Sequence, residues 1–556
     1  VPEGLLDLDR EAIFTAPDET ENQLHQTILR GSYDVNDSVR VDGVGFYRRN
    51  RTRSFNGDGS EFEECVVDGL EVLIEGLEED ELDAAGLDCA AGITTAMLDA
   101  AGGEVAENVE GNPIAAEFDD PLTGEDHERD AINNISRRTQ TSWGGDLQTT
   151  FDGELSGRDN RLVVGGGIFR GEADFDSDTE VSFLNPVTRS TNNSPDSGEF
   201  VEEARTRVNT ETHTVSLYFT DTLSLTNAIA VTLAGRYNRT RIKIRDRSGD
   251  RPELNGNHTF SRFNPAVGLT WQARDQHNLY ASYNESSRAP TPIELSCNDE
   301  IAELAELLSG DDDFECRLPN AFLADPPLDQ VVAKTIEAGV RGELGAINYH
   351  VGLFRTEHHD DIIFQSTGRA TGLFKNVDET RRQGMETRLS GRVGNLTWYG
   401  AYTFLKATYE SDFEALSPNH AGADAEGLIN VRAGDRLPGI PKHLFKLGGD
   451  YRHSDWALGA ELLHNSSQFL RGDESNQLDR VDGHTVVNLR SSYRINKNIS
   501  IRARVNNVFD TDYETFGIVG EDPDEVVGLG GIDDSPLFFG PAPGRAAFVT
   551  VKAEFD

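Results

Sequence analysis

Short segments throughout the chain alternate between apolar and polar residues, which is the period of a β-strand with one apolar face. In residues 546–555 the apolar positions lie on one face and most charged positions on the other. The apolar set is Ala547, Val549, Val551, Ala553 and Phe555, and the polar set is Thr550, Lys552 and Glu554. Residues 498–506, 347–353 and 229–233 repeat this pattern, so an all-β fold is predicted.

About seventeen strands are predicted, with boundaries given to about two to four residues. They are residues 22–32, 36–52, 137–152, 160–175, 207–222, 227–245, 260–273, 277–287, 331–343, 346–358, 380–393, 396–411, 442–453, 456–472, 483–495, 498–508 and 545–555. The chain contains no apolar run of about 18 residues, so no transmembrane helix is predicted. This leaves a barrel possible, because a transmembrane β-strand needs only about 9–11 residues.

Very short and long connections alternate between these strands. The short ones are residues 33–35, 223–226, 274–276, 394–395 and 496–497, and the long ones are 53–136, 176–206, 288–330, 412–441 and 509–544. A soluble sandwich has no reason to place every long connection at one end. A transmembrane antiparallel β-barrel does, because its periplasmic turns are short and its extracellular loops are long. We therefore predict such a barrel.

The two faces of the predicted strands agree with a barrel. One face carries small and branched apolar residues, whereas the other carries charged residues such as Glu337, Arg341 and Glu343. A soluble protein buries the apolar face, while a barrel turns it toward lipid and keeps a wet lumen. Periodicity alone does not separate these two cases, so the prediction depends on the asymmetry of the connections.

Composition and charge narrow the function. The chain has 556 residues, 54 of them Gly and only 2 Met, and its hydrophobic fraction of 37% is low for a large soluble core. The net charge is −46, and residues 54–130 contain 24 Asp and Glu against one basic residue, Arg129. Such a polyanion repels phosphates, so a nucleic-acid partner is not expected.

The four cysteines form two pairs that are close in sequence, Cys65 with Cys89 and Cys297 with Cys316. Each pair lies in a stretch without strand periodicity, which favours loop disulfides in an oxidising compartment over free thiols. A metal site would need a CxxC-type spacing or a nearby His, and the sequence around these cysteines has neither.

The acidic stretch 53–136 is predicted to be a long extracellular loop with structure of its own. Its portion 71–100 has helical spacing and is expected to form a short helix or two, tied by Cys65–Cys89. A structured, solvated loop is the simpler interpretation, and the functional alternative is a lid or ligand-gathering loop. NGDGSEFEE at 56–64 suggests calcium, although the spacing of an EF-hand loop is absent.

No catalytic set or cofactor motif is present. The sequence lacks a nucleophile elbow, an HExxH motif and a Walker-type glycine loop, so no enzyme activity is predicted. The run HHDD at 358–361 could suggest a metal. Because adjacent strand residues point to opposite faces, His358 and His359 enter one site only if the strand bulges, and a polar strand end is the simpler interpretation.

Several stretches resemble TonB-dependent outer-membrane receptors of the siderophore-receptor type. In family order they are YASYNESSRAPTPIEL (280–295), KTIEAGVRG (334–342), FKNVDETRRQGMETRLSG (374–391), GDRLPGIPKHLFKLGGDYR (434–452), VNNVFDTDYETFG (505–517) and GPAPGRAAFVTVKAEF (540–555). The residues that carry the motifs are Arg288, Ala289, Pro290, Glu337, Gly339, Gly384, Glu386, Pro438, Pro441, Asn506, Asn507, Phe509, Asp510, Tyr513, Gly544, Arg545 and Phe555. The last two stretches form one C-terminal signature. Each motif is weak alone, whereas five in order over 280–555 are specific.

The resemblance implies a monomeric receptor in the outer membrane that imports a scarce ligand, such as a ferric siderophore. The energy would come from the TonB–ExbB–ExbD complex. Haem, cobalamin or an oligosaccharide could use the same scaffold. A passive channel that prefers cations is the main alternative from another class. A structural or adhesive barrel would be expected to have repetitive loops, and the sequence shows none.

The chain departs from the family pattern at both ends. Asp556 follows Phe555, where family barrels usually end on an aromatic residue. Nothing resembles the plug domain or the short box that contacts the energising partner, and family barrels have 22 strands. We therefore expect residues 1–556 to be the barrel domain without its plug and about five first strands, with residues 1–14 in an extracellular loop.

The resemblance also suggests residues that could contact ligand or plug. Arg288 lies where a strand gives way to the loop of Cys297 and Cys316, where it could face an anionic ligand or anchor a neighbouring strand. With His358 and His359, it is a candidate for the vestibule. Lumenal arginines, namely Arg341, Arg388 and Arg392, would contact the plug.

Overall fold

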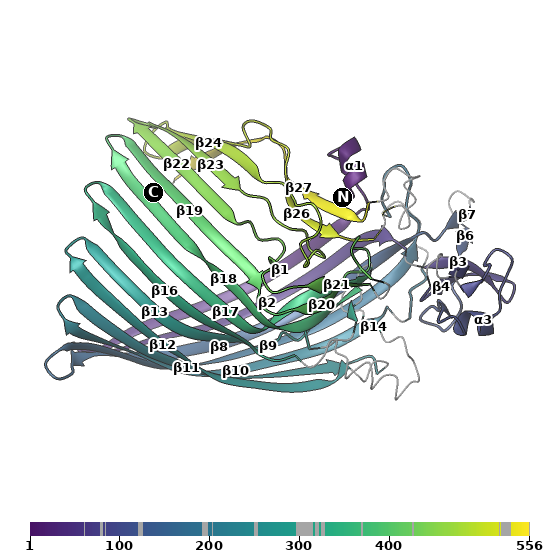
Figure 1. Ribbon diagram of the computed structural model, residues 1–556, viewed down its shortest axis with the longest axis horizontal. Helices are drawn as coiled ribbons and strands as arrows, with labels where there is room; N and C mark the ends of the chain where they lie inside the picture. The colour runs from purple at the N-terminus through teal and green to yellow at the C-terminus, as the bar shows by residue number, and fades with distance from the viewer. Residues whose placement is uncertain are drawn as a thin grey trace.

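A computed structural model shows one large antiparallel sheet with smaller elements gathered at one of its ends (Figure 1). It describes residues 1–60, 62–77, 82–83, 85–119, 126–191, 198–202, 204–249, 254–295, 315–316, 322–323, 328–368, 371–424, 427–521, 523 and 535–554. Among these residues no helix is long and apolar enough to cross a membrane.

The large sheet has 17 strands, and each overlaps one of the predicted segments. They are β1 (Asp18–Asn36), β2 (Val39–Gly59), β8 (Ala131–Glu154), β9 (Asp159–Ser182), β10 (Thr206–Thr226), β11 (Ile229–Asp246), β12 (Gly256–Arg274), β13 (His277–Arg288), β16 (Val331–Leu344), β17 (Ile347–Gly368), β18 (Thr371–Val393), β19 (Leu396–Tyr409), β22 (His443–His453), β23 (Trp456–Asn465), β24 (His484–Arg494), β25 (Ile499–Asn506) and β28 (Ala546–Ala553).

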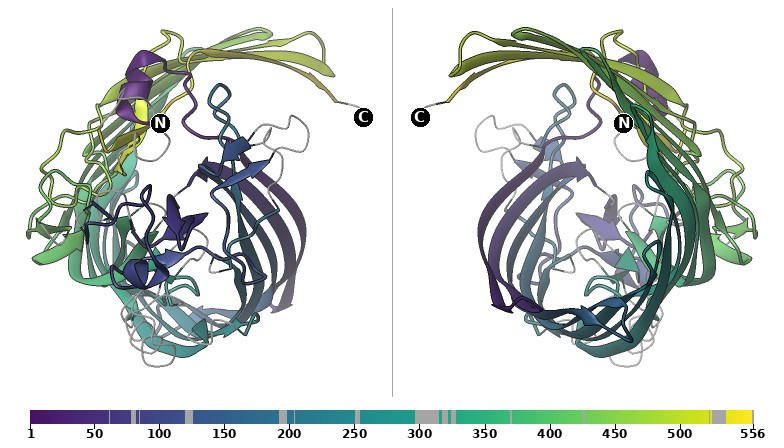
Figure 2. Two further views of the ribbon diagram at one scale, coloured as in Figure 1. Left: turned by 90° about the vertical axis from the view of Figure 1, so that its right-hand side faces the viewer. Right: turned by 90° about the vertical axis from the view of Figure 1, so that its left-hand side faces the viewer.

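Every strand of this sheet pairs antiparallel with its neighbour in the chain, from β1 to β28. Figure 2 shows that the sheet curls strongly along its whole width without meeting itself. In the described part of the chain, β1 pairs only with β2 and β28 only with β25. Closure of a barrel is therefore not seen among these residues, and each edge strand keeps one unpaired side.

The connections confirm the predicted asymmetry, because all the tight turns lie at one end of the sheet and the longer connections at the other (Figure 1). Two predicted turns are wrong in position. The turns lie at 37–38 and 227–228, after the predicted 33–35 and 223–226. Side chains at the strand ends set them: Asn36 Oδ1 accepts the Ser38 N–H, and Thr226 Oγ1 accepts the Ile229 N–H.

Several strands differ in length from the prediction. β17 and β18 form a long hairpin, whereas the pattern ended one strand at 358 and began the next at 380. The extension is held by packing, since Ile362 and Phe374 contact the buried cluster around Ile244 and the Phe364 and Phe374 rings meet at 5.3 Å. β23 ends at Asn465, and the predicted strand residues 466–472 belong to a loop.

The side chains divide between the two faces of the sheet as a membrane wall requires. Large apolar residues on the outward face remain exposed; Leu147 is 60% exposed and Leu217 is 62% exposed. Polar and charged residues cover the opposite, inward face, as the networks described below show. Exposed leucines at these positions would be unfavourable in water, whereas lipid accepts them.

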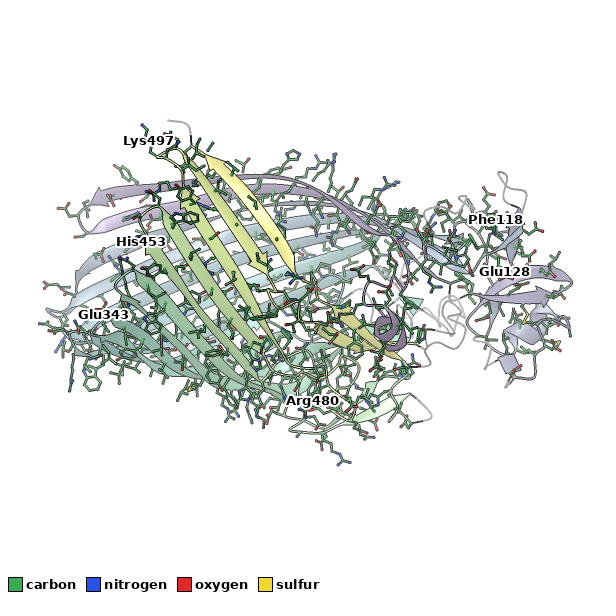
Figure 3. The ribbon with its side chains drawn as sticks, turned by 90° about the horizontal axis from the view of Figure 1, so that it is seen from above. Phe118, Glu128, Glu343, His453, Arg480 and Lys497 are labelled. Carbon is green, nitrogen blue, oxygen red and sulfur yellow. A yellow bond between two sulfur atoms is a disulfide. The ribbon has the colours of Figure 1, made fainter. Side chains whose placement is uncertain are left out.

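The acidic connection between β2 and β8 folds into a small unit at the loop end of the sheet; Phe118 and Glu128 mark it in Figure 3. Its strands are β3 (Glu63–Val67), β4 (Leu70–Glu75), β5 (Glu104–Val105), β6 (Glu117–Asp119) and β7 (Asp126–Glu128), and its helix is α3 (Thr95–Asp99). A disulfide joins Cys65 to Cys89 and confirms that predicted pair. Cys65 packs with Ile74, Leu98 and five further buried residues.

The helical prediction for residues 71–100 is only partly right. Residues 71–75 belong to β4, a strand that pairs with β3 on one side and β5 on the other. Val72, Leu73 and Ile74 are all buried, because the strand is covered on both of its faces. A strand covered on both faces has a continuous apolar run, and a short run of this kind does not distinguish a strand from a buried helix. The helix α3 is confined to five residues.

The remaining elements also lie at the loop end. They are α1 (Glu3–Leu8), β14 (Glu315–Cys316), β15 (Phe322–Leu323), β20 (Phe413–Leu416), β21 (Leu428–Val431), β26 (Glu514–Val519) and β27 (Leu537–Pro541). The first residues lie against β27, where the Val1 amino group donates to the Phe539 carbonyl at 3.0 Å. Arg10 donates to Glu514 Oε1 at 2.7 Å. Residues 1–14 thus lie among the long connections, as predicted.

Candidate functional site

The inward wall of the sheet carries polar networks that join residues from several strands. In the first, the Tyr280 hydroxyl of β13 lies 2.7 Å from Glu337 Oε1 of β16 and 2.9 Å from His350 Nε2 of β17. The Arg341 guanidinium lies 5.9 Å from the centre of the Tyr280 ring. This network borders a cavity of ≈ 350 Å³ on the same wall.

Glycines on the neighbouring strands make room for the Tyr280 ring. A Cβ at Gly339 would lie 2.6 Å from the Tyr280 hydroxyl and 2.6 Å from the Val351 carbonyl oxygen. A Cβ at Gly352 would lie 3.0 Å from the same hydroxyl. The predicted motif residues Glu337 and Gly339 therefore act together, one as hydrogen-bond acceptor and the other as the space for the ring.

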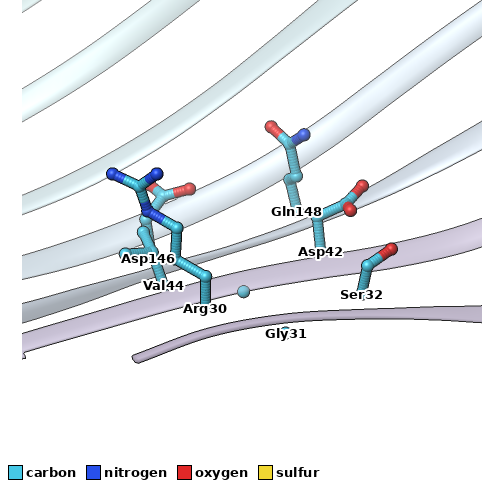
Figure 4. Close-up of a pocket in the computed structure, with 8 residues that line it drawn as sticks. Arg30, Gly31, Ser32, Asp42, Val44, Asp146 and Gln148 are labelled. Carbon is cyan, nitrogen blue, oxygen red and sulfur yellow. The ribbon is translucent and has the colours of Figure 1, made fainter. Parts of the chain in front are cut away.

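A second network lies on β8 and β10. The Tyr218 hydroxyl donates to Asp146 Oδ1 at 2.6 Å and lies 3.2 Å from Gln148 Oε1. Asp146 and Gln148 also line a cavity of ≈ 420 Å³ together with Arg30 of the edge strand β1 and Asp42 of β2 (Figure 4). Figure 4 shows these polar side chains on one side of the strands, so the inward wall is polar up to the edge strand β1.

A third network joins the strands toward the other edge. The Arg490 guanidinium of β24 contacts both Asp450 carboxylate oxygens of β22, at 2.8 and 2.9 Å. Glu461 of β23 accepts from Lys446 at 2.9 Å and from the Tyr399 hydroxyl of β19. The inward wall thus holds paired charges, which suits a water-filled lumen or a polar domain within it.

The motif that ends β25 ties that strand to the start of β28. Asn507, at a φ of +47°, donates from its side chain to the Thr511 carbonyl and accepts the Thr511 N–H, which closes a tight turn. Asp510 Oδ1 then accepts the Arg545 N–H at 2.6 Å. These contacts explain the motif structurally, because they hold Arg545 at the point where β28 begins.

Arg288 ends β13 at the loop end, and its guanidinium contacts Glu294 Oε2 at 2.8 Å. Glu294 also accepts the Thr291 N–H at 2.6 Å, so the Arg-Ala-Pro turn is held by one carboxylate. The Arg288 side chain is 46% exposed. Its role in a vestibule stays a prediction, and the observed partner is a residue of the following turn.

The two adjacent histidines do not converge. His358 Nδ1 lies 2.7 Å from an Arg382 nitrogen, whereas His359 Nδ1 lies 4.0 Å from Glu379 Oε2. Among the described residues no group of three or more His, Cys, Asp or Glu residues is arranged to hold a metal. The vestibule role of these histidines stays a prediction.

Two long connections meet at a polar cluster, which we call the loop junction: Ser417, His420, Asp473, Glu474 and Asn476. All of these residues except the half-buried Asn476 are buried. His420 Nε2 lies 3.1 Å from Asp473 Oδ1, and both side chains are fully buried. The Gly422 N–H donates to His420 Nδ1, so Nε2 carries the proton of the neutral ring. Ser417 donates to the Gly472 carbonyl, and Asn476 accepts the Arg436 N–H.

Glu474 is the member of the loop junction whose pKa is raised. It is 8% exposed, and burial raises its pKa from 4.5 to about 7. Hydrogen bonds from the backbone N–H groups of Glu474 and Gly472 and the Arg471 charge lower this pKa in part, and the neighbouring Asp473 charge raises it. The carboxylate accepts the Gly472 N–H at 3.2 Å. The loop junction therefore contains one carboxyl group that titrates near neutral pH.

The remaining predicted residues are placed as follows. Gly384 and Glu386 lie on β18, Pro438 and Pro441 precede β22, Phe509 is exposed, and the Tyr513 ring stacks on His484 at 4.1 Å. Cys297 and Phe555 lie outside the described residues, so the Cys297–Cys316 pair and the role of Phe555 stay predictions. Contacts of Arg341, Arg388 and Arg392 with a plug stay predictions as well.

Sequence reasoning missed the inward tyrosines and the loop junction. A usable signal for the tyrosines was present, because Tyr218, Tyr280 and Tyr399 each occupy an inward position beside glycine-rich strands. The loop junction has no comparable signal, since its residues lie in connections without periodicity. Only the fold brings His420 and Asp473 together across 53 residues of sequence.

The fold and its two faces define a membrane β-barrel wall, and comparison with known proteins names its family. The family model "TonB dependent receptor-like, beta-barrel" matches residues 6–508. The chain belongs to this family, which consists of outer-membrane transport receptors.

Individual relatives are distant. The ferric-pyoverdine 358 receptor of Pseudomonas putida is 24% identical over 261 residues, which cover 45% of this chain and 26% of that protein. The metal-pseudopaline receptor CntO of Pseudomonas aeruginosa is 23% identical over 284 residues, covering 50% of this chain and 34% of CntO. The ferric-catecholate import receptor Fiu of E. coli, in its closed form, superposes with a TM-score of 0.62 at 14% identity, covering 97% of this chain and 64% of Fiu.

Proposed function

We propose that the chain forms the wall of an outer-membrane receptor that binds a scarce metal chelate, most directly a ferric siderophore, and imports it with energy from the TonB–ExbB–ExbD complex. The observation that supports this proposal most is the family match over residues 6–508 on a sheet with a lipid-type outward face and a polar inward wall. The ligand class is supported by the names of relatives that bind ferric-pyoverdine and metal-pseudopaline.

Residues 1–556 are proposed to act as the barrel domain of a larger receptor, with 53–136 as an extracellular loop. The unpaired sides of β1 and β28 support further strands, since an open edge in lipid leaves backbone hydrogen bonds unmade. The polar inward wall, with cavities beside Asp146 and Glu337, supports a plug inside the lumen. We expect the receptor to be a monomer.

The experiment is an uptake assay with radioactive iron carried by a panel of purified siderophores, in cells that depend on this protein for growth on the chelate. We expect saturable uptake at submicromolar chelate that stops when the inner-membrane energy complex is inactivated. Uptake that is insensitive to the energy complex and linear with concentration would overturn the proposal. That result would favour the passive channel, which conductance measurements on the protein in planar bilayers would then establish.

A matched pair of variants links uptake to the described wall. Glu337→Gln removes a lumenal charge that accepts from Tyr280, whereas Glu172→Gln changes an exposed carboxylate on the outward face of β9. Outer-membrane levels of both proteins are measured first. We expect lower uptake in the first variant only, because the ligand is proposed to move along the inward wall and the plug to lie against it. Equal uptake by both would remove this network from the transport route.

A further inference from the structure

The outward face of β11 changes abruptly from apolar to cationic. Its outward positions near the short turn are Ile229, Val231 and Leu233, followed by Tyr237. The next four outward positions toward the loop end are all basic, and we call them the cationic row: Arg239, Arg241, Lys243 and Arg245. In a chain with a net charge of −46, four successive cations on one face of a strand are unusual.

The cationic row begins at the point where the apolar part of the outward face of β11 ends. From Ile229 to Tyr237 the strand has nine residues, and a membrane crossing needs about 9–11. Tyr237 pairs in register with Phe263 of β12, and both rings are exposed on the outward face. Aromatic residues gather at such borders because one side of the ring contacts hydrocarbon and the other contacts headgroups. The row therefore lies directly above an interfacial aromatic pair.

Within the described part of the chain the four cations form no ion pair, whereas neighbouring cations do. Arg170 of β9 pairs with Glu211, Arg207 of β10 with Asp178 at 2.6 Å, and Arg247 with Asp176. None of the four residues of the cationic row forms an ion pair with a residue that the structure describes. Arg241 has a neutral partner, Asn257, at 2.8 Å. Three of the four are exposed, so their charge is available to a ligand.

The outward acids of the adjoining strands do not neutralise the row. Glu211 lies opposite Lys243 in the register of β10 and β11, but its carboxylate contacts Arg170. Asp176 and Asp178 contact Arg247 and Arg207. Asp174 accepts from the Asn209 side chain and lies 3.8 Å from Arg247. Glu172 lies on β9, two strands away from β11, which corresponds to about 10 Å at the usual strand spacing. The outward face above β11 therefore attracts anions, although the protein as a whole repels them.

From this geometry we propose that the cationic row binds a phosphorylated glycolipid of the outer leaflet. The inference rests on the proposed membrane location. Six residues separate Arg239 from Arg245, which is about 20 Å along a strand and about 14 Å in height at a tilt of about 45°. A phospholipid headgroup layer is only about 5–8 Å thick. A headgroup with phosphates on several sugars matches the height of the row, and guanidinium groups suit phosphate oxygens.

β2 supports the inference with a similar arrangement. Arg49, Arg51 and Arg53 follow Tyr47 on its outward face, and all three are exposed. Tyr47 pairs in register with Trp143 of β8, which gives the same aromatic border below the cations. The same sequence of residue types thus appears on two separate strands, as one interface around the wall would require.

The test measures lipid binding by native mass spectrometry on the protein extracted from outer membranes in mild detergent. The probes are rough lipopolysaccharide with phosphorylated core sugars, its dephosphorylated form, and phosphatidylglycerol. The test variant combines Arg239→Gln, Arg241→Gln, Lys243→Gln and Arg245→Gln. The control makes the same charge change with exposed arginines at the short-turn end, namely Arg158→Gln, Arg274→Gln, Arg452→Gln and Arg494→Gln.

We expect the test variant to bind the phosphorylated glycolipid about 600-fold more weakly, with at least one fewer lipid per protein, since each of the four cations near an anionic headgroup contributes about a fivefold factor. The control should bind like the unmodified protein, and the dephosphorylated lipid should not distinguish the three. Unchanged glycolipid binding by the test variant would overturn the inference. Equal dependence of phosphatidylglycerol binding on the four residues would also overturn it, in favour of an ordinary phospholipid.

Cell fractionation separates this inference from the proposed function. A protein absent from the outer membrane would refute both. A protein present there, with energy-dependent uptake but lipid binding that ignores the cationic row, would refute only the glycolipid site. Retained uptake in the test variant is expected, because the row faces away from the lumen.

Discussion

Glu474 makes the loop junction sensitive to pH. Its carboxyl group has a pKa of about 7 in the folded protein against 4.5 without burial. Between these values the folded state holds a proton that the opened state has released, so the stability of the junction falls as pH rises from 4.5 toward 7. The shift of about 2.5 units corresponds to about 3 kcal/mol, or about a 10²-fold change in the opening equilibrium.

Hydrogen exchange measures this effect directly. After correction for intrinsic exchange rates, we expect amides of residues 466–483 to open about 10²-fold more at pH 8 than at pH 4.5. The variant Glu474→Gln removes the ionisable group and should give nearly the same opening at both values. The matched control is Glu414→Gln, an exposed carboxylate of the adjoining connection, which should keep the pH dependence of the unmodified protein.

Two results would refute this reasoning. Exchange of residues 466–483 that is independent of pH in the unmodified protein would show that Glu474 titrates at an ordinary value. A Glu474→Gln protein that opens more than the unmodified protein at pH 8 would show that the contact with the Gly472 N–H outweighs the burial of charge.

Three further predictions concern stability. The double variant Cys65→Ser and Cys89→Ser removes a disulfide between cysteines 24 residues apart in sequence. It should destabilise the small acidic unit by about 3 kcal/mol, measured by limited proteolysis, and unchanged cleavage would contradict this. Tyr280→Phe leaves Glu337 without a donor and should cost about 1–3 kcal/mol. A heat-modifiability gel shift at the same temperature as the unmodified protein would contradict this. Gly339→Ala forces a methyl group onto the Tyr280 hydroxyl and the Val351 carbonyl, which should destabilise the protein by about 1–3 kcal/mol and lower the temperature of its gel shift. Gly153→Ala, on β8 in open space and without a positive φ, controls for the loss of a strand glycine alone.

The strands were largely predictable because the signal for them is local. A period of two residues assigns each residue to a face, so the outward Leu217 and the inward Tyr218 follow from sequence alone. The long hairpin beyond His358 was missed because packing against the cluster around Ile244 extends it. β4 was mistaken for a helix because both of its faces are buried.

The candidate site was predictable only in part. The motif residues Glu337 and Gly339 were identified by resemblance, but their partner Tyr280 was not, since it is 57 residues away from Glu337 in sequence. The two-residue period of a strand predicts whether a side chain points inward. The register between strands decides which inward side chains meet. The sequence therefore gives no direct list of network partners.

By itself, the sequence determined the all-β class, the two faces of the wall, the asymmetry of the connections and the Cys65–Cys89 pair. Each of these depends on spacing within one short segment. The tertiary structure alone decided that His420 meets Asp473 and that Glu474 is buried. It also decided that Arg207 and Arg247 form ion pairs with acids, whereas the cationic row forms none with the described residues. These features depend on contacts between segments, and a contact has an energy only once the register and the loop packing have set the distance.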